Sequence, residues 1–160
     1  MAIKVGDKIP SVQLKTMAAD GMKTVSTDDL FKGRKVVLFA LPGAFTPTCS
    51  AKHLPGFVQN ADKLRAKGVD TIACLSVNDA FVMDAWGKHQ NVGEKVVMLA
   101  DGNADFSKAV GLTMDGTGYG MGTRASRYAM VVENGVVKKL NIEAPGAFEV
   151  SSAEAVLKAL

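Results

Sequence analysis

The fold of this chain is decided by one stretch, Lys35–Leu41 (KVVLFAL), which runs directly into Pro42–Cys49 (PGAFTPTC). The first half is a nearly continuous apolar run rich in β-branched residues, which predicts a strand covered on both faces. The second half holds two prolines and a glycine, which end the strand in a turn. Apolar residues at helical spacing come next, namely Leu54, Phe57, Val58, Ala61 and Leu64. The stretch therefore predicts a buried strand, a turn and a helix that begins near Cys49.

Apolar strands and amphipathic helices alternate on both sides of this unit. The other predicted strands are Ser11–Thr16, Met22–Val25, Val69–Val77 and Val96–Leu99. A second helix is predicted after the cap residue Asn78 or Asp79, with an apolar stripe made of Phe81, Val82, Ala85 and Trp86. Two further helices are predicted at Ala104–Val110 and Ser151–Leu160. Near the end, alternating runs flank Asn134-Gly135, which is the strongest short signal for a β-hairpin because both turn residues must take a positive φ.

The order of these elements predicts an α/β fold. A β-α-β half followed by a β-β-α half is the layout of a thioredoxin-like fold, in which helices flank a central mixed β-sheet on both faces. The chain has 160 residues and contains no repeat, low-complexity tract or linker. We therefore expect a single domain over residues 1–160.

Composition and charge exclude several classes of protein. The net charge is only +3, from 19 Lys and Arg against 16 Asp and Glu, and it is spread along the chain, so we expect no nucleic-acid partner. The longest uncharged run, Val36–Ala51, is broken by Pro42, Gly43 and Pro47, so we expect no membrane partner. No secretion signal opens the chain and cysteines are few, which predicts reduced thiols and a cytoplasmic location.

Cysteine and histidine are scarce, with only Cys49, Cys74, His53 and His89. They show no paired ligand spacing, so we expect neither a metal site nor a cofactor. A lone intracellular cysteine is usually a small buried hydrophobe. Cys49 differs because the predicted first helical turn brings free amide N–H groups and the positive end of the helix dipole to its sulfur. Both favour the thiolate, so Cys49 is a candidate nucleophile.

The residues around Cys49 also carry a family signature. The run PGAFTPTCS contains the pattern PxxxTxxC, at Pro42, Thr46 and Cys49. HLPGF follows the cysteine, CLSVND ends the second buried strand, RYAMVVENG leads into the hairpin turn, and VGDKIP stands near the start. With these motifs spread over nearly its whole length, the chain resembles the peroxiredoxin 5 (plant type II) subfamily.

The resemblance implies a thiol-dependent peroxidase that reduces hydrogen peroxide and alkyl hydroperoxides to water and alcohols, in antioxidant defence and redox homeostasis. Cys49 would attack the peroxide and become a sulfenic acid. Thr46 would hydrogen-bond the thiolate and the peroxide, and Pro42 would keep water off the pocket. Arg127 matches the family's arginine and would hold the thiolate and polarise the O–O bond. Arg124, which ends a glycine-rich loop, is the alternative cation.

Several other residues have a plainer interpretation. His53 lies four residues after Cys49 on the same helical face, where we favour a packing role over a tuning role. Trp86 and His89 lie on or beside an apolar stripe, so we expect both in the core. The segment Gly120–Ala125 matches a dinucleotide-binding GxGxxA pattern, but it leads into a strand rather than a helix. We expect the glycine-rich stretch Gly116–Gly122, which holds the start of this match, to be a mobile loop near the pocket or at a subunit contact.

The sequence leaves the regeneration step open. Animal peroxiredoxin 5 proteins carry a C-terminal resolving cysteine, whereas Ala147–Ser152 (AFEVSS) has none. Cys74 lies in the middle of a predicted buried strand, so we expect a structural thiol rather than an internal resolving cysteine. The expected reductant is an external thiol, namely glutathione with or without glutaredoxin, and thioredoxin is the second choice.

Other functions can use similar chemistry. A peroxide sensor or thiol relay, which passes oxidation to a partner protein, needs the same Cys49. A cysteine hydrolase needs a histidine base with an orienting Asn or Asp, and only His53 is near, so this alternative is the weakest. The resemblance also implies a homodimer with residues near the active-site turn at the interface.

Overall fold

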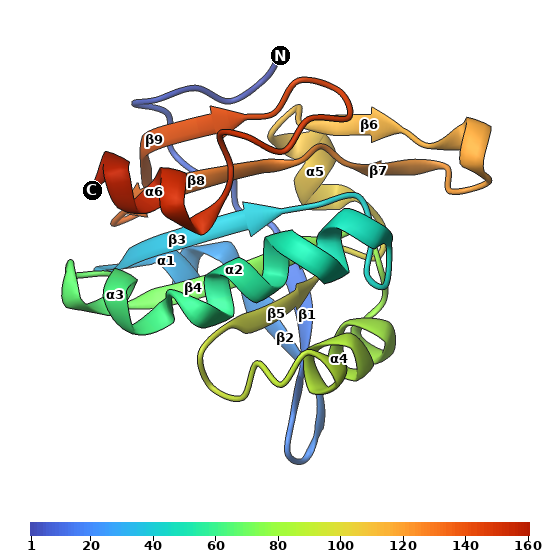
Figure 1. The fold of residues 1–160 in the computed structure, drawn as a ribbon, viewed down its shortest axis with the longest axis horizontal. Coiled ribbons are helices and arrows are strands. Elements are labelled where there is room, and N and C mark those ends of the chain that lie inside the picture. Colours follow the sequence, from blue (N-terminus) through green and yellow to red (C-terminus); the bar gives the residue numbers. More distant parts are fainter.

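The centre of the molecule is a seven-stranded mixed β-sheet, seen in a computed structural model that describes residues 1–160 (Figure 1). The order across the sheet is β2-β1-β5-β4-β3-β8-β9. The pairs β3–β4 and β4–β5 are parallel and the other pairs are antiparallel. The strands are β1 (Gln13–Ala18), β2 (Gly21–Ser26), β3 (Lys35–Ala40), β4 (Thr71–Ser76), β5 (Val97–Ala100), β8 (Tyr128–Glu133) and β9 (Val136–Ile142).

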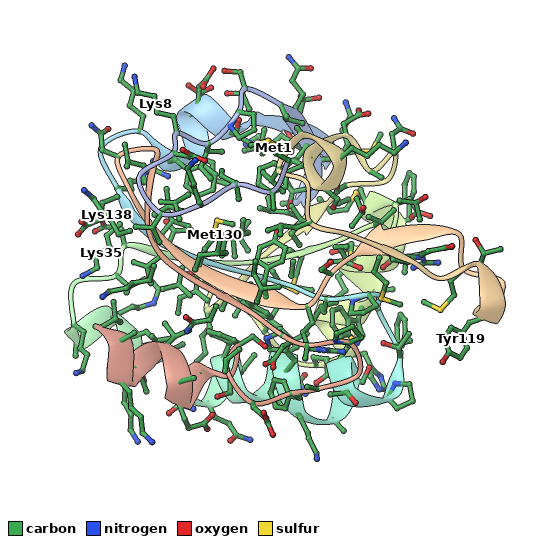
Figure 2. The ribbon with its side chains drawn as sticks, turned by 90° about the horizontal axis from the view of Figure 1, so that it is seen from above. Met1, Lys8, Lys35, Tyr119, Met130 and Lys138 are labelled. Atoms are coloured by element: carbon green, nitrogen blue, oxygen red, sulfur yellow. The ribbon has the colours of Figure 1, made fainter.

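Helices cover both faces of this sheet, as predicted. One face carries α2 (Leu54–Gln59), α3 (Ala61–Ala66) and α6 (Ala153–Ala159), while α1 (Thr27–Phe31) and α5 (Asp105–Ala109) lie behind it in Figure 1. The view from above in Figure 2 shows the same separation. Residues of α4 (Ala80–His89) pack into the same core as α2. No helix is both long enough and apolar enough to span a membrane.

The sheet separates two apolar cores, and β3 contributes to both. Val37 and Phe39 pack into the core under α2, whereas Val36 and Leu38 pack into the core on the α1 and α5 side. Successive side chains of a strand point to opposite faces, so a strand buried on both faces needs an unbroken apolar sequence. This confirms the prediction from the KVVLFAL run.

The helix predicted after the turn is interrupted. A π-helical turn (η1, Cys49–His53) comes first, and α2 and α3 follow as separate helices. They part at Asn60, whose side-chain Nδ2 donates to the Gly56 carbonyl at 2.8 Å. The predicted apolar stripe is nevertheless buried at Leu54, Phe57, Ala61 and Leu64.

The apolar stripe predicted for α4 is largely wrong. The helix buries Ala80, Met83, Trp86 and Gly87, whereas Phe81 is 64% exposed and His89 is exposed rather than in the core. Two of these four buried residues, Ala80 and Gly87, are small because the helix lies close to the sheet: a Cβ on Gly87 would lie 2.9 Å from Met98 Cγ. Asp79 is the N-cap and accepts from the Val82 N–H at 2.8 Å. The predicted stripe was chosen by hydrophobicity, which does not reveal that Ala80 and Gly87 pack against the core.

The C-terminal half contains two β-hairpins, of which the sequence predicted one. Asn134 and Gly135 both have positive φ, 48° and 80°, which confirms the hairpin between β8 and β9. The glycine-rich stretch Gly116–Gly122, which was expected to be a loop, connects the two strands of a second small hairpin, β6 (Thr113–Asp115) and β7 (Thr123–Ala125), and contains the short 3-10 turn η2 (Thr117–Tyr119). This hairpin projects beyond the main sheet, with exposed Tyr119 near its tip (Figure 2).

Candidate active site

The turn that follows β3 packs tightly against neighbouring loops. Gly43 is buried, and a Cβ there would lie 3.1 Å from Arg124 Nη1 and 3.2 Å from Thr46 Cγ2, so a larger residue would displace both. The Ala44 N–H donates to Asn78 Oδ1 at 3.0 Å. Asn78 therefore fastens this turn instead of capping the next helix.

Cys49 opens the π-helical turn that links this loop to α2. The Leu54 N–H donates to the Cys49 carbonyl, one residue further back than in an α-helix. Pro55, at the start of α2, has no N–H to continue an α-helical ladder into the turn. The wide turn explains why Cys49 and His53 do not follow the regular helical spacing assumed from the sequence.

Trp86 of α4 and Gln90, the residue that follows α4, hold the other side of this turn. Trp86 Nε1 donates to Ser50 Oγ at 3.0 Å, and Gln90 Nε2 donates to the Ser50 carbonyl at 3.1 Å. Phe45 has a φ of 64°, in the left-handed region that side chains rarely adopt, and its exposed ring lies 6.4 Å from the Trp86 ring. Contacts on both sides therefore fix the backbone around Cys49.

Arg127 brings a positive charge to the sulfur of Cys49. It directly precedes β8, which pairs with β3, so it lies beside the strand that leads to the active-site turn. Its Nη2 donates a hydrogen bond to Cys49 Sγ at 3.0 Å. Cys49 is fully buried and Arg127 is half-buried. A charged donor binds a negative acceptor more strongly than a neutral one.

The two other signature residues lie in the turn but make no hydrogen bond to the sulfur. Thr46 Oγ1 donates to the Gly43 carbonyl at 2.6 Å, so its hydrogen is engaged and its lone pairs remain free to accept. Pro42 is half-buried, and its carbonyl accepts from Arg124 Nη1 at 3.3 Å. The structure therefore joins Arg127 to Cys49 directly, and it places Thr46 and Pro42 in the loop leading to them.

Arg124 has a different position from Arg127. Its Nε donates to the Met121 carbonyl at 2.9 Å, and its Nη1 reaches the Pro42 carbonyl. These bonds tie the β6–β7 hairpin to the active-site turn and leave no hydrogen bond to Cys49. The geometry therefore favours Arg127 as the cation beside the sulfur.

His53 does more than fill space in the core. Its Nδ1 lies 2.8 Å from Arg127 Nη1, and its Nε2 lies 3.0 Å from the Ser151 carbonyl oxygen. Burial, followed by the positive charge of Arg127, lowers the pKa of His53 to about 3. His53 is therefore a neutral, fully buried ring that is hydrogen-bonded to the active-site arginine.

Sequence analysis missed the segment that covers these residues from the C-terminal side. The ring of Phe148 lies 5.8 Å from Arg127 Cζ and 5.0 Å from the His53 ring. The carboxylate of Glu143 accepts hydrogen bonds from the Ser151 N–H and hydroxyl, at 2.7 and 2.6 Å. These partners lie far from Cys49 in sequence and form no short motif, so no local pattern could have identified them.

Cys74 lies on the same side of the sheet as Cys49 but in different surroundings. It is fully buried in β4, where it pairs in register with Phe39 of β3 and Met98 of β5. Burial raises the pKa of the Cys74 thiol, and negative charge on Cys49 raises it further. Cys74 therefore stays a neutral thiol. Both cysteines are free.

No other arrangement in the molecule gathers comparable chemistry. No group of three or more His, Cys, Asp or Glu side chains is placed to hold a metal ion. A cavity of about 880 Å³ lies between β1, β2, the end of α4 and β5, where Met17, Lys88 and Met98 are among its lining residues. None of the residues around Cys49 lines this cavity.

Comparison with known proteins gives consistent matches over nearly the whole chain. Residues 4–157 match the Redoxin family. The chain is 55% identical to the chloroplastic peroxiredoxin-2E-2 of rice, covering 99% of this chain and 72% of that protein, and 51% identical to the chloroplastic peroxiredoxin-2E of Arabidopsis thaliana, covering 99% and 70%. The crystal structure of reduced Prx3 from Vibrio vulnificus in complex with H2O2 is 56% identical, covers 98% of each chain and superposes with a TM-score of 0.95.

These matches confirm the predicted thioredoxin-like fold and the resemblance to the plant type II subfamily. The predicted cytoplasmic location is wrong by the same comparison, because both plant relatives are chloroplastic proteins. Reduced thiols and a small net charge fit either compartment, so composition could not separate them. The chain belongs to the redoxin family, and within it this protein is a peroxiredoxin, a thiol-dependent peroxidase.

Proposed function

We propose that Cys49 is the peroxide-reactive thiol of this peroxidase. Its thiolate attacks the terminal oxygen of a hydroperoxide: a sulfur–oxygen bond forms, the O–O bond breaks, and the leaving oxygen takes a proton to become water or an alcohol. The sulfur is oxidised to a sulfenic acid while the peroxide is reduced. The observation that supports this most is the 3.0 Å hydrogen bond from Arg127 Nη2 to Cys49 Sγ, because it holds a cation at the atom that reacts as an anion.

Neighbouring groups would assist this step. Arg127 can stabilise the charge that develops on the breaking O–O bond. Thr46 Oγ1 spends its hydrogen on Gly43 and can accept the peroxide O–H. The Cys49 N–H has no acceptor within the chain and can donate to a peroxide oxygen. Pro42 adds an apolar ring without an N–H, which limits water at the site.

Regeneration would use an external thiol. The first thiol attacks the sulfenic sulfur and releases water, which leaves a mixed disulfide on Cys49. A second thiol then forms a disulfide with the first and frees Cys49. Cys74 is a poor internal partner, because it is a buried neutral thiol in the middle of β4. Glutathione with glutaredoxin is the favoured reductant and thioredoxin is the second choice.

The protein would act as a homodimer, each copy contributing one single domain over residues 1–160. Three aromatic side chains are exposed on the active-site turn, the start of α4 and the β6–β7 hairpin, namely Phe45, Phe81 and Tyr119. Exposed aromatic residues are typical of the centres of protein interfaces. Burial of this surface against a second copy would place the interface near Cys49, and sedimentation analysis would test it.

The experiment that tests the function measures consumption of hydrogen peroxide and of an alkyl hydroperoxide by the pure protein. Parallel assays would contain glutathione with glutaredoxin, or thioredoxin with its reductase. We expect turnover with the glutaredoxin system, total loss in Cys49→Ser and retained turnover in the matched control Cys74→Ser. Loss of turnover in Cys74→Ser with every reductant would contradict an external-thiol cycle.

The same assay separates the enzyme from the alternative of a peroxide sensor or thiol relay. A peroxidase turns over many times with a small thiol or a general reductant protein. A relay would stop after one stoichiometric round and would accumulate a mixed disulfide with one specific partner. We expect sustained turnover and the antioxidant role that goes with it.

A further inference from the structure

The segment that follows β9 is fastened beside Arg127 by the carboxylate of Glu143. The Glu143 N–H donates to the Arg127 carbonyl at 3.0 Å, which sets the two residues side by side. Glu143 Oε2 then accepts from the N–H groups of Glu149, Val150 and Ser151, at 2.9, 2.9 and 2.7 Å. Burial acts to raise the pKa of Glu143, but these bonds together with the Ser151 hydroxyl outweigh it and lower the pKa. The carboxylate is therefore a charged anchor for this loop.

The anchored loop determines which nitrogen of His53 carries the hydrogen. The carbonyl of Ser151 can only accept, so His53 Nε2, 3.0 Å away, must be the donor. The ring is neutral, so its Nδ1 has no hydrogen and presents a lone pair. Arg127 Nη1, 2.8 Å from that lone pair, donates to it. The position of the Ser151 carbonyl thus orients the His53 ring, and the His53 ring orients the guanidinium of Arg127.

The guanidinium of Arg127 is held on two edges and one face. Nη1 donates to His53 at 2.8 Å, and Nη2 donates to Cys49 Sγ at 3.0 Å. The Phe148 ring lies 5.8 Å from Cζ, a separation typical of a cation–π contact. Because the guanidinium is planar and rigid, fixing Nη1 also fixes the direction in which Nη2 points.

We propose that His53 is a positioning residue for the peroxidase reaction: its unprotonated Nδ1 orients Arg127 toward the sulfur of Cys49, and the Glu143-anchored loop orients His53. This inference rests on the proposed role of Cys49. It extends that role by assigning a function to a residue that touches neither sulfur nor peroxide. The proposal predicts that the rate of the peroxidase reaction depends more on an acceptor at the position of Nδ1 than on a donor at the position of Nε2.

Three substitutions of His53 separate these two contacts. Asn places its Oδ1 close to the position of Nδ1 and keeps the acceptor for Arg127. Gln places its Nε2 close to the position of the histidine Nε2 and keeps the donor for Ser151 alone. Leu keeps neither. The measured quantities are the second-order rate constant for hydrogen peroxide and the thermal unfolding midpoint of each variant.

We expect His53→Leu and His53→Gln to lose about 10- to 100-fold in the rate constant, because a small misplacement of a catalytic group has effects of that size. We expect His53→Asn to stay within about fivefold of the wild type, since about 1 kcal/mol, or roughly fivefold, is the net value of one hydrogen bond. His89→Leu, at an exposed histidine of α4, is the matched control and keeps the wild-type rate.

Two results overturn the proposal: a wild-type rate in His53→Leu, or a rate in His53→Gln equal to or above that of His53→Asn. If His53→Leu fails to fold, the Asn and Gln pair still decides between the two contacts. Cys49→Ser is measured alongside, so that failure of the positioning role is distinguished from failure of the proposed function. An active Cys49→Ser would refute the proposed function, whatever the histidine variants do.

Discussion

Cys49 and Cys74 are both fully buried on the same side of the sheet, yet the groups that surround the two sulfurs differ. Cys74 lies between the pairing partners Phe39 and Met98 in the middle of a strand. Cys49 lies at the start of a helical turn with Arg127 Nη2 at 3.0 Å from its sulfur. Burial alone raises the cost of a thiolate, and burial beside a cation offsets that cost. The proposed reactivity of Cys49 therefore rests on the neighbours of its sulfur and not on its exposure.

The backbone supports this difference. A strand residue has both backbone groups committed to the sheet, so β4 offers Cys74 no free donor. The turn at Cys49 leaves its N–H without an acceptor, and contacts from Asn78 and Trp86 hold that turn in place. The same core thus contains one thiol in a rigid apolar strand and one in a polar, anchored turn.

The most severe test of the comparison removes the cation. We expect Arg127→Gln to lower the rate constant for hydrogen peroxide by about 10²- to 10³-fold, because loss of one donor to a developing anion has that effect in other enzymes. Arg124→Gln is the matched control, since its bonds go to the Met121 and Pro42 carbonyls and not to sulfur. Stopped-flow fluorescence of Trp86, the single tryptophan, measures the reaction. Equal losses in both variants would contradict the assignment of Arg127.

Much of this architecture could be predicted from local sequence. The KVVLFAL strand, the Asn134-Gly135 turn and the position of Cys49 at a helix start follow from patterns within a few residues. The α4 stripe was misjudged because Ala80 and Gly87 face the sheet through close packing, which hydrophobicity does not reveal. The π-helical turn depends on how the loop, α4 and Pro55 fit together.

The network around Arg127 could not be predicted for a different reason. His53 contacts the side chain of Arg127, which lies 74 positions further along the chain. It also contacts the backbone carbonyl of Ser151, which lies 98 positions further along. A backbone carbonyl carries no sequence signature at all. Only the register of β8 and β9, together with the loop anchored by Glu143, brings these groups to one place.

A second test uses acid, because the Cys49 side of the core depends on a neutral histidine. The pKa of His53 is about 3 in the folded protein and 6.5 as its ordinary value, so the unfolded chain takes up a proton first as pH falls. Stability is fully present above about pH 6.5 and is lost progressively toward pH 3. At pH 4.5 the loss is roughly 2–3 kcal/mol, at about 1.4 kcal/mol for each pH unit below 6.5.

Denaturant unfolding of the wild type and His53→Asn between pH 7 and pH 4 measures this effect. The wild type should lose more stability than the variant over that range, because Asn binds no proton in either state. Parallel curves for the two proteins would mean that His53 is not held neutral by the fold.

The smallest expected effect is on the Cys74 side. Cys74→Ala removes one buried sulfur from β4 and should lower the free energy of unfolding by about 1–2 kcal/mol, as for other small core truncations. The rate constant for hydrogen peroxide should stay within about twofold of the wild type, since a twofold change is below about 0.5 kcal/mol. If the Cys74→Ala protein is fully folded and its rate constant still falls by more than this, the two thiols are chemically coupled, which would contradict the comparison.

The most direct test of the central claim identifies which sulfur peroxide oxidises. The reduced protein would be treated with one equivalent of hydrogen peroxide in the presence of dimedone, which traps sulfenic acids, and the peptides analysed by mass spectrometry. The account predicts the adduct on Cys49 and an unmodified thiol at Cys74. An adduct on Cys74, or a disulfide between the two cysteines in place of the adduct, would contradict it.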